Sequence, residues 1–324
     1  MRPLSGILAF LVLLAGGIPA SGQPISPAVG PAATNQPAVA APDTSPVDGR
    51  VPGVPGGTLR TPASWSEPTA PFHIVGNIHY VGSAGLAAYL ITSPSGSILL
   101  DGTLVENVPQ IEHNIPALGF RLRDVKILLN SHAHYDHAGG LQQLKRDTGA
   151  ILLASAGDRP ALESGIPPSD TSYGVVTFPP VKVDRVLVDG EPIRLGDITL
   201  TPWMTPGHTP GCTSFGMTVK ERGRLLHVIF PGSLTVAGNR LIGNKGYPGI
   251  AGNLRRSIRR VGRMQADVVL PAHPELADVL GRARQAAVGT RDAFLMPGVL
   301  ARIVDDSEKA FDAELAKETT AAMH

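Results

Sequence analysis

Residues 130–137 read NSHAHYDH and place four potential metal ligands within six positions, namely His132, His134, Asp136 and His137. The segment follows a run at 125–129 that is typical of a buried strand. In an extended loop His132 and His134 point the same way, and Asp136 and His137 follow at the turn. Neutral imidazole and carboxylate are ordinary zinc ligands, so the loop can present two pairs of ligands to two metal ions. The segment therefore predicts a metal centre at the end of a strand.

Two further histidines supply the third ligand that each of two catalytic metal sites needs. His208 lies in the turn-rich segment TPGHTPG at 205–211, and His273 lies in LPAHP at 270–274. Both follow strand-type runs, and loops at one rim of a sheet can converge on one site. We therefore predict that His208 and His273 are metal ligands. The histidines without such surroundings are interpreted as ordinary residues: His73, His79, His113, His227 and His324.

The chain from Trp65 onward alternates between strand-type and helix-type patterns. Strands are expected at 72–75, 78–81, 87–92, 97–100, 125–129, 183–188, 198–203, 213–219, 225–230 and 267–270. Helices are expected at 105–118, from 141, and at 254–264, 276–287 and 301–317. Strands followed by helices, twice over, predict an α/β fold in which two β-sheets pack face to face with helices on their outer sides.

The first 60 residues differ from the rest of the chain. Residues 1–22 combine a weakly basic start, an apolar run at 4–14 and small residues at 16–22, which is the order of a secretory signal peptide. Residues 23–60 are rich in Pro, Gly and Ala, contain no aromatic residue, and predict a disordered linker. We therefore expect an exported protein, periplasmic or secreted, with one folded domain at 61–324.

Composition limits the remaining possibilities. The net charge of +1 creates no overall field that favours nucleic acid, an anionic membrane or an acidic partner. The single cysteine, Cys212, excludes an intrachain disulfide and is interpreted as a small buried residue. A nucleic-acid enzyme stays open as an alternative because five arginines form a basic strip on one expected helix, although a solvated face is the preferred interpretation. These are Arg255, Arg256, Arg259, Arg260 and Arg263.

Taken together, the cluster at 132–137, the PGHTPG loop and the PAHP segment resemble the metallo-β-lactamases, and above all their third subclass. The likeness extends over residues 65–320 and implies an αβ/βα sandwich that holds two zinc ions. It implies a first zinc ion held by His132, His134 and His208, and a second held by Asp136, His137 and His273. The resemblance further implies hydrolysis of β-lactam antibiotics by a hydroxide that bridges the two ions, with a catalytic part for Asp136.

Three more residues receive roles from this resemblance and from their positions. In the third subclass a serine resembling Ser233 and a hydroxyl residue resembling Thr235 bind the substrate carboxylate. Asp101 ends the strand that faces the cluster, and we predict that it orients a ligand histidine. A structural interpretation is also open for each of them, because serine, threonine and aspartate are common in turns.

Relatives within the superfamily hydrolyse thioesters, lactones or RNA with a similar cluster, usually with an Asp that bridges the metals. No Asp occurs between His208 and Asp267 in this chain. This absence favours a small β-lactam as the substrate. The net charge and the expected export favour neither nucleic acid nor, after signal cleavage, a membrane as a partner. A lactonase or thioesterase is the alternative on the same fold, and a non-catalytic exported zinc-binding protein is the alternative from another class.

Overall fold

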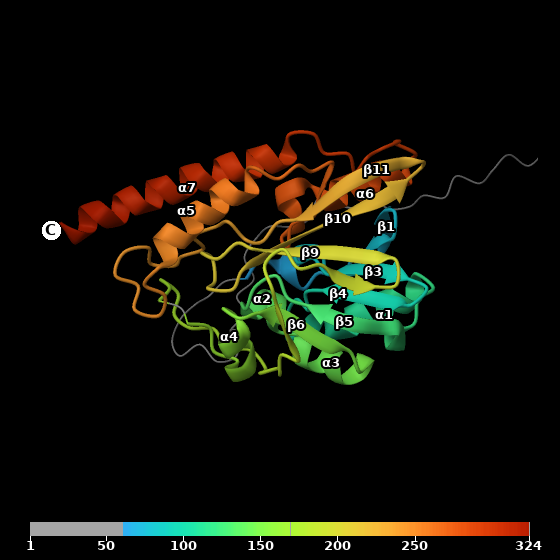
Figure 1. Ribbon diagram of the computed structural model, residues 1–324, viewed down its shortest axis with the longest axis horizontal. Helices are drawn as coiled ribbons and strands as arrows, with labels where there is room; N and C mark the ends of the chain where they lie inside the picture. Colours follow the sequence, from blue (N-terminus) through green and yellow to red (C-terminus); the bar gives the residue numbers. More distant parts are fainter. Residues whose placement is uncertain (1–60, 169, 324) are drawn as a thin grey trace, which may run out of the picture. The chain divides into compact units, whose positions relative to one another are not determined.

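Two β-sheets pack against each other in the computed structural model, which describes residues 61–168 and 170–323 (Figure 1). One sheet has seven strands in the order β1-β2-β3-β4-β5-β6-β7, and the other has five in the order β12-β11-β10-β9-β8. Figure 1 shows α1 and α3 on the outer side of the first sheet, and α5 and α7 on the outer side of the second. The predicted α/β sandwich is confirmed.

The seven-stranded sheet starts as an antiparallel meander and continues with parallel strands. The meander consists of β1 (Phe72–Val75), β2 (Ile78–Tyr80), β3 (Tyr89–Ser93) and β4 (Gly96–Leu100). The parallel part adds β5 (Val125–Leu129), β6 (Ile151–Ser155) and β7 (Arg185–Leu187). Parallel neighbours need crossover connections, which here contain α1 (Val108–Ala117), α2 (Tyr135–Ala138), α3 (Leu141–Thr148) and α4 (Arg159–Ser164).

The five-stranded sheet is antiparallel except at one edge. Its antiparallel strands are β8 (Ile193–Leu195), β9 (Ile198–Met204), β10 (Thr213–Glu221) and β11 (Arg224–Phe230). At the edge, β12 (Val268–Val269) pairs parallel with β11. The helices of this half are α5 (Ile250–Val261), α6 (Val279–Ala287) and α7 (Val299–Ala322). Four short 3-10 helices cover Ala63–Trp65, Val105–Asn107, Leu122–Asp124 and Pro274–Ala277.

Side chains alternate along the central strands, as a sheet covered on both faces requires. In β4, Ile98 and Leu100 belong to the hydrophobic cluster between the two sheets, whereas Leu99 belongs to the cluster beneath α1 and α3. β5 has the same division, with Ile127 and Leu129 inside the sandwich and Leu128 outside it. The alternation therefore fixes which face of the sheet each of these side chains covers.

Several element boundaries differ from the predicted ones. α5 begins at Ile250 rather than at 254, and ends before Gly262 rather than at 264. The helix predicted at 276–287 is interrupted at Asp278, whose φ of +49° ends a 3-10 turn and starts α6. The sequence interpretation also omitted β6 and β8, because a short apolar run such as ILLAS carries no period that separates a strand from a helix.

The predicted signal peptide at 1–22 and the predicted linker at 23–60 lie outside the described residues. All the described residues belong to one compact unit. Within 61–168 and 170–323, no helix is both long enough and apolar enough to cross a membrane.

Hydrogen bonds between the sheets bring several strand ends to the same rim. The backbone N–H of Thr213, at the start of β10, donates to the Ser131 carbonyl at 2.8 Å. On the other side the Tyr89 hydroxyl donates to the Pro271 carbonyl at 2.7 Å, and the Ala87 N–H donates to the Ala272 carbonyl at 2.9 Å. The loops after β5, β9 and β12, which carry all the predicted metal ligands, therefore lie together.

Replacing Tyr89 by Phe tests how much this anchoring stabilises the fold. Tyr89 is only 1% exposed, so water cannot replace the lost hydroxyl and the Pro271 carbonyl loses its partner. We expect Tyr89→Phe to lower the free energy of unfolding by about 1–3 kcal/mol, measured by urea denaturation. Tyr135→Phe is the matched control, because its hydroxyl has no hydrogen bond within the described residues. Equal effects of the two substitutions would contradict the anchoring role.

Candidate metal centre

Four of the predicted ligands come from the connection that follows β5. His132 lies in the loop, and His134 is the extended residue that precedes the short helix α2, with φ −104° and ψ 156°. Asp136 and His137 lie within α2. All four side chains are buried, and the ring centroids of His132 and His137 are 4.1 Å apart.

His132, His134 and His208 form a first trio. One ligand atom from each of them lies within 4.8 Å of the others. His208 reaches the trio from the loop after β9, and its ring centroid is 4.6 Å from that of His132 and 4.6 Å from that of His134. Three imidazoles that converge from two loops are a donor set suited to zinc.

Asp136, His137 and His273 form a second trio beside the first. The Asp136 Oδ2 atom is 3.1 Å from His137 Nε2 and 3.5 Å from His273 Nε2, and the two nitrogen atoms are 3.2 Å apart. His132 also lies within ligand distance of Asp136 and His137, so the two trios adjoin. The structure thus gathers all six predicted ligands at one rim of the sandwich.

The hydrogen bonds around His132 fix which ring nitrogen carries its proton. The Ser131 hydroxyl donates to Asp101 Oδ2 at 2.6 Å, which uses its only proton. The same hydroxyl lies 3.0 Å from His132 Nδ1, so it accepts a hydrogen bond from that nitrogen. The Nε2 atom of His132 therefore keeps a free lone pair that is suited to metal binding.

His208 is oriented in the same way by a backbone carbonyl. Its Nδ1 atom lies 2.9 Å from the Thr235 carbonyl oxygen. A carbonyl oxygen only accepts, so Nδ1 must donate and Nε2 carries the free lone pair. Thr235 was predicted only as a substrate-binding residue, and its backbone holds a predicted ligand as well.

Burial and mutual repulsion keep the first trio neutral. Burial lowers the pKa of His134 to about 4. Burial also lowers the pKa of His132 and of His208 well below their usual range, and neighbouring histidines lower both further. Neutral imidazole is the form that binds a metal ion.

The second trio carries the opposite electrostatic arrangement. Burial acts to raise the pKa of Asp136, but the neighbouring His137 and His273 outweigh it and hold that pKa well below its usual range. Burial acts to lower the pKa of His137, but Asp136 outweighs it and raises that pKa. A carboxylate buried this deeply needs a positive charge beside it, which either a proton on His137 or a metal ion supplies. The donor set of both trios therefore fits zinc.

Asp101 lies behind the cluster, as predicted, but contacts mainly Ser131. Its Oδ1 atom accepts from the Ser131 N–H at 2.7 Å and its Oδ2 atom from the Ser131 hydroxyl. Oδ2 is also 3.8 Å from His137 Nδ1, a buried nitrogen without a hydrogen-bond partner among the described residues. Asp101 thus reaches His132 through Ser131, and it lies next to His137.

A residue that the sequence analysis missed, Asp158, ties two ligand loops together. Its Oδ2 atom accepts from the Ala133 N–H at 2.9 Å and from the Thr209 hydroxyl at 2.8 Å, and its Oδ1 atom accepts from the Gly211 N–H at 2.8 Å. Ala133 separates His132 from His134 in the sequence, and Thr209 follows His208. One buried carboxylate therefore fixes both loops that form the first trio. Nothing in the sequence near Asp158 signals this role.

The glycines of the PGHTPG loop are required by close packing. A Cβ atom at Gly211 would lie 2.0 Å from Ser155 Oγ and 2.2 Å from the Asp158 backbone nitrogen. At Gly207, where φ is +149°, a Cβ atom would lie 2.4 Å from the Cα of Leu254 in α5. Only glycine fits either position, so both are needed to seat His208 between its neighbours.

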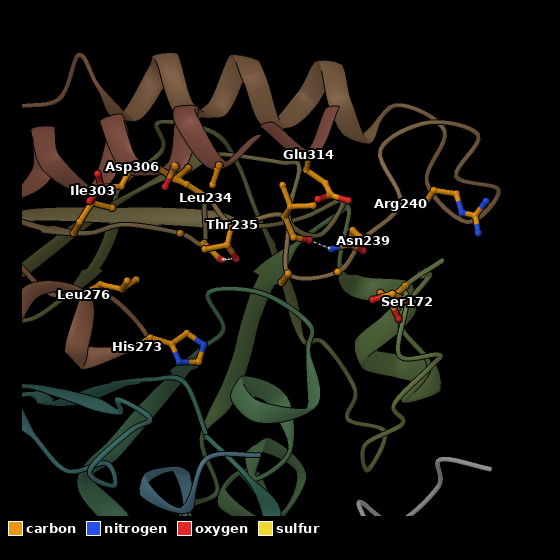
Figure 2. A pocket seen from close by; sticks show the side chains of 18 of the residues that line it. Ser172, Leu234, Thr235, Asn239, Arg240, His273, Leu276, Ile303, Asp306 and Glu314 are labelled. Atoms are coloured by element: carbon orange, nitrogen blue, oxygen red, sulfur yellow. Dashed lines mark hydrogen bonds between the residues drawn. The ribbon is translucent and has the colours of Figure 1, made fainter. Parts of the chain in front are cut away.

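The other residues singled out in the sequence lie around this centre or away from it. Ser233 and Thr235 follow β11, with their hydroxyl oxygens 3.1 Å apart, and together with His273 they line one groove (Figure 2). Cys212 is fully buried, and burial raises the pKa of its thiol, which agrees with a packing role.

The predicted arginine strip lies on α5 and the residues just after it, with Arg256, Arg259, Arg260 and Arg263 lining one surface hollow and Arg255 outside it. Arg255 pairs with Asp312 at 2.9 Å, and its guanidinium lies over the Phe311 ring. Arg260 pairs with Asp189 at 3.0 Å and donates to the Met204 carbonyl. Arg256 also donates to the Asn253 side-chain oxygen. Three of the five charges therefore make contacts within the fold, which weakens the interpretation as a nucleic-acid surface.

Known proteins share both the sequence pattern and the fold of this chain. Residues 86–273 match the family described as "Metallo-beta-lactamase superfamily". BJP-1, a subclass B3 metallo-beta-lactamase of Bradyrhizobium japonicum, has 41% sequence identity and a TM-score of 0.77, covering 80% of this chain and 98% of BJP-1. The FEZ-1 metallo-beta-lactamase of Legionella gormanii has 36% identity and a TM-score of 0.75, covering 79% of this chain and 98% of FEZ-1.

Similarity to curated proteins is more local. A hydroxyacylglutathione hydrolase of Methylococcus capsulatus is 35% identical over 101 residues, which is 31% of this chain and 31% of that protein. A hydroxyacylglutathione hydrolase of Rhodospirillum rubrum is 32% identical over 84 residues, which is 26% of each. The chain therefore matches less than a third of the length of these two relatives.

Asp158 gives a pH-dependent test of how the first trio is held. Burial raises the pKa of Asp158 to about 6, although its three hydrogen bonds act to lower it. In the unfolded chain the pKa is about 3.9, so the folded protein holds this proton more tightly. The contribution of Asp158 to stability is thus fully present below pH 4 and is lost as the pH rises through 6.

Asp158→Asn removes this ionisation. We therefore expect the free energy of unfolding of the wild-type protein, relative to that of Asp158→Asn, to fall by about 2–3 kcal/mol from pH 4 to pH 7. Urea denaturation of the metal-free proteins measures it. Asp184→Asn is the control, because Asp184 pairs with Lys145 at 2.6 Å and hydrogen bonding and this charge lower its pKa although burial opposes them. A difference for Asp158→Asn that stays constant with pH contradicts the prediction.

Proposed function

The chain belongs to the metallo-beta-lactamase superfamily, and from this premise we propose that it hydrolyses the amide bond of β-lactam antibiotics in a zinc-dependent reaction. The observation that supports the proposal most is the arrangement of the two adjoining ligand trios, which contain no cysteine and no aspartate other than Asp136. The similarity to subclass B3 enzymes over nearly their whole length supports the same substrate class.

In this proposal the two trios hold two zinc ions. His132, His134 and His208 hold the first, and Asp136, His137 and His273 hold the second, with Asp136 at the reaction centre. When bound, the ions supply a Lewis acid for the lactam carbonyl and a shared hydroxide at neutral pH, because zinc lowers the pKa of bound water to about 7. With three protein ligands for each ion, an open position remains for substrate.

The protein keeps the ligands in a productive orientation. Asp101 and Ser131 hold the proton of His132 on Nδ1, and the Thr235 carbonyl does the same for His208. Hydrogen bonds to the second ring nitrogen fix the direction of a metal-binding imidazole and raise its basicity. Asp101 is thus proposed as a positioning residue rather than a ligand.

Ser233 and Thr235 are proposed to bind the substrate carboxylate. The Thr235 hydroxyl lies 3.3 Å from His208 Nδ1, but that nitrogen already carries a proton and cannot accept from it. The hydroxyl proton is therefore free to be donated to Ser233 or to a substrate. Two adjacent hydroxyl donors at the edge of the groove suit a carboxylate.

A second candidate is suggested by the curated relatives, which are named hydroxyacylglutathione hydrolases. Hydrolysis of an acylated glutathione would use the same two ions, because fold and metal do not determine the substrate. The loop after β11 has Gly232, Ser233 and Leu234 and no aspartate, so it lacks the bridging ligand expected for thioester hydrolysis. This absence favours the β-lactam.

We also propose that the protein is exported, with cleavage near residue 22, and that it confers antibiotic resistance. The order of basic, apolar and small residues at 1–22 supports export. β-Lactams act outside the cytoplasm, so an exported hydrolase meets them before their targets.

Metal content and turnover should depend on each other. Two complete trios predict about two zinc ions per chain, measured by elemental analysis of the purified protein. Exhaustive chelation should abolish hydrolysis of a chromogenic cephalosporin, and added zinc should restore it. Hydrolysis that survives chelation contradicts the metal mechanism, and a much higher kcat/KM for an acyl-glutathione than for any β-lactam reassigns the substrate.

Replacing one ligand should abolish catalysis but keep the fold. We expect His134→Ala to lower kcat/KM for a cephalosporin by about 100-fold or more, because it removes a ligand of the first trio. The variant should keep its circular dichroism spectrum, since the large apolar core does not depend on the site. His227→Ala, an exposed histidine of β11, is the control and should match the wild type. Equal activity in both variants overturns the assignment.

A further inference from the structure

A groove continues from the proposed carboxylate-binding residues along α7 (Figure 2). Its volume is about 870 Å³. Ser233, Thr235 and His273 line one part of it, and residues of α7 line another. Of the six proposed metal ligands His273 lines this cavity, together with the proposed carboxylate donors, so the groove begins at the edge of the metal centre.

One face of α7 forms a wall of this groove. Ile303, Asp306, Ala310 and Glu314 all line it, and they repeat at intervals of three and four, which places them on one side of a helix. Figure 2 shows Asp306 and Glu314 on the same side of α7, with Thr235 below them. Ala310 is one turn away from each of these acidic residues, so a small side chain stands at the middle of the wall.

The interior of the groove is mainly apolar. Leu234 and Ile303 are almost fully buried, and Leu276 is 37% exposed although it is a large apolar side chain. These residues come from the loop after β11, from α7 and from the 3-10 turn after His273. Figure 2 shows them around the same space. An apolar surface of this kind favours contact with an apolar ligand group.

Most charged residues at the groove already have partners. Glu314 pairs with Lys317 at 2.9 Å, and the Glu318 carboxylate accepts from the N–H groups of Leu241 and Ile242. Arg302 donates to the Leu276 carbonyl at 3.0 Å. These paired charges fix the walls of the groove. Asp306 has no partner among the described residues, so its carboxylate remains beside the shape and the apolar interior to select a ligand.

The chemistry of β-lactams indicates which part of a substrate enters. In cephalosporins and carbapenems, the ring carbon next to the carboxylate-bearing carbon carries a variable substituent, whereas penicillins carry two methyl groups there. A carboxylate held by Ser233 and Thr235 therefore brings that substituent to the start of the groove.

We propose that the groove between the loop after β11 and α7 binds this substituent. The protein would then favour cephalosporins and carbapenems with an extended, largely apolar group at that carbon. The inference rests on the proposed β-lactam hydrolysis, and it adds Ala310, Leu276 and Ile303 as residues that determine specificity.

Filling the groove at Ala310 tests the proposal. Two cephalosporins are compared that share the acyl side chain and differ at the ring carbon, one with a methyl group and one with an extended aryl-vinyl group that is not eliminated. We expect Ala310→Trp to lower kcat/KM for the extended substrate by about tenfold or more, mainly through KM, and to change that for the methyl substrate less than about twofold. Ala310→Leu should give a smaller loss in the same direction.

The matched control is Ala316→Trp. Ala316 is an exposed alanine of the same helix that does not line the groove, and it is about 120° around the helix from Ala310. It should leave both substrates unchanged. Equal losses for both substrates in Ala310→Trp, or no loss in either, overturn the groove assignment while the hydrolysis itself stands. If the wild-type protein hydrolyses neither cephalosporin, the proposed function fails and this inference fails with it.

Discussion

Buried carboxylates that bind backbone and hydroxyl donors are the constraint on which this metal centre depends. The proposed ligands come from three separate connections, and an imidazole can bind a metal ion only if its loop holds it in place. Asp158 joins the loop of His132 and His134 to the loop of His208 through three hydrogen bonds. Asp101 accepts hydrogen bonds from the backbone and the hydroxyl of Ser131, and the Ser131 hydroxyl in turn orients His132. Both carboxylates are almost completely buried, and these bonds offset only part of the cost of burial, since the pKa of each carboxyl is raised by burial.

The site must both hold its metal ligands and select a substrate, and largely different residues serve these two tasks. The ligand side chains supply the charge and the lone pairs, and the buried Asp101 and Asp158 set their positions from behind. Thr235 takes part in both tasks, because its carbonyl holds His208 and its hydroxyl is proposed to bind the substrate. The groove on the other side is bounded by the loop after β11 and by α7, neither of which contributes a metal ligand. Substrate preference can therefore change at residues such as Ala310 without disturbing the reaction centre.

The fold and the ligands could be predicted from the sequence because their signals are local. Four ligands within six residues, and histidines set in PGHTPG and PAHP, require no knowledge of tertiary structure. Both sheets could be predicted because strand-type and helix-type runs are also recognisable from short stretches of sequence. Asp158 escaped prediction because its three partners lie 25, 51 and 53 residues away, and no local pattern marks it. The second role of Thr235 escaped because a backbone carbonyl, not its side chain, holds His208. The groove escaped because it exists only where α7 packs beside a distant loop.

The central claim is that two metal ions bind here, each to its own trio of side chains. Crystals grown with zinc, and diffraction data collected on both sides of the zinc absorption edge, test it most directly. Two anomalous peaks are expected, one bound by His132, His134 and His208 and the other by Asp136, His137 and His273. A single peak, or a map in which His208 or His273 points away from the metal, would contradict it.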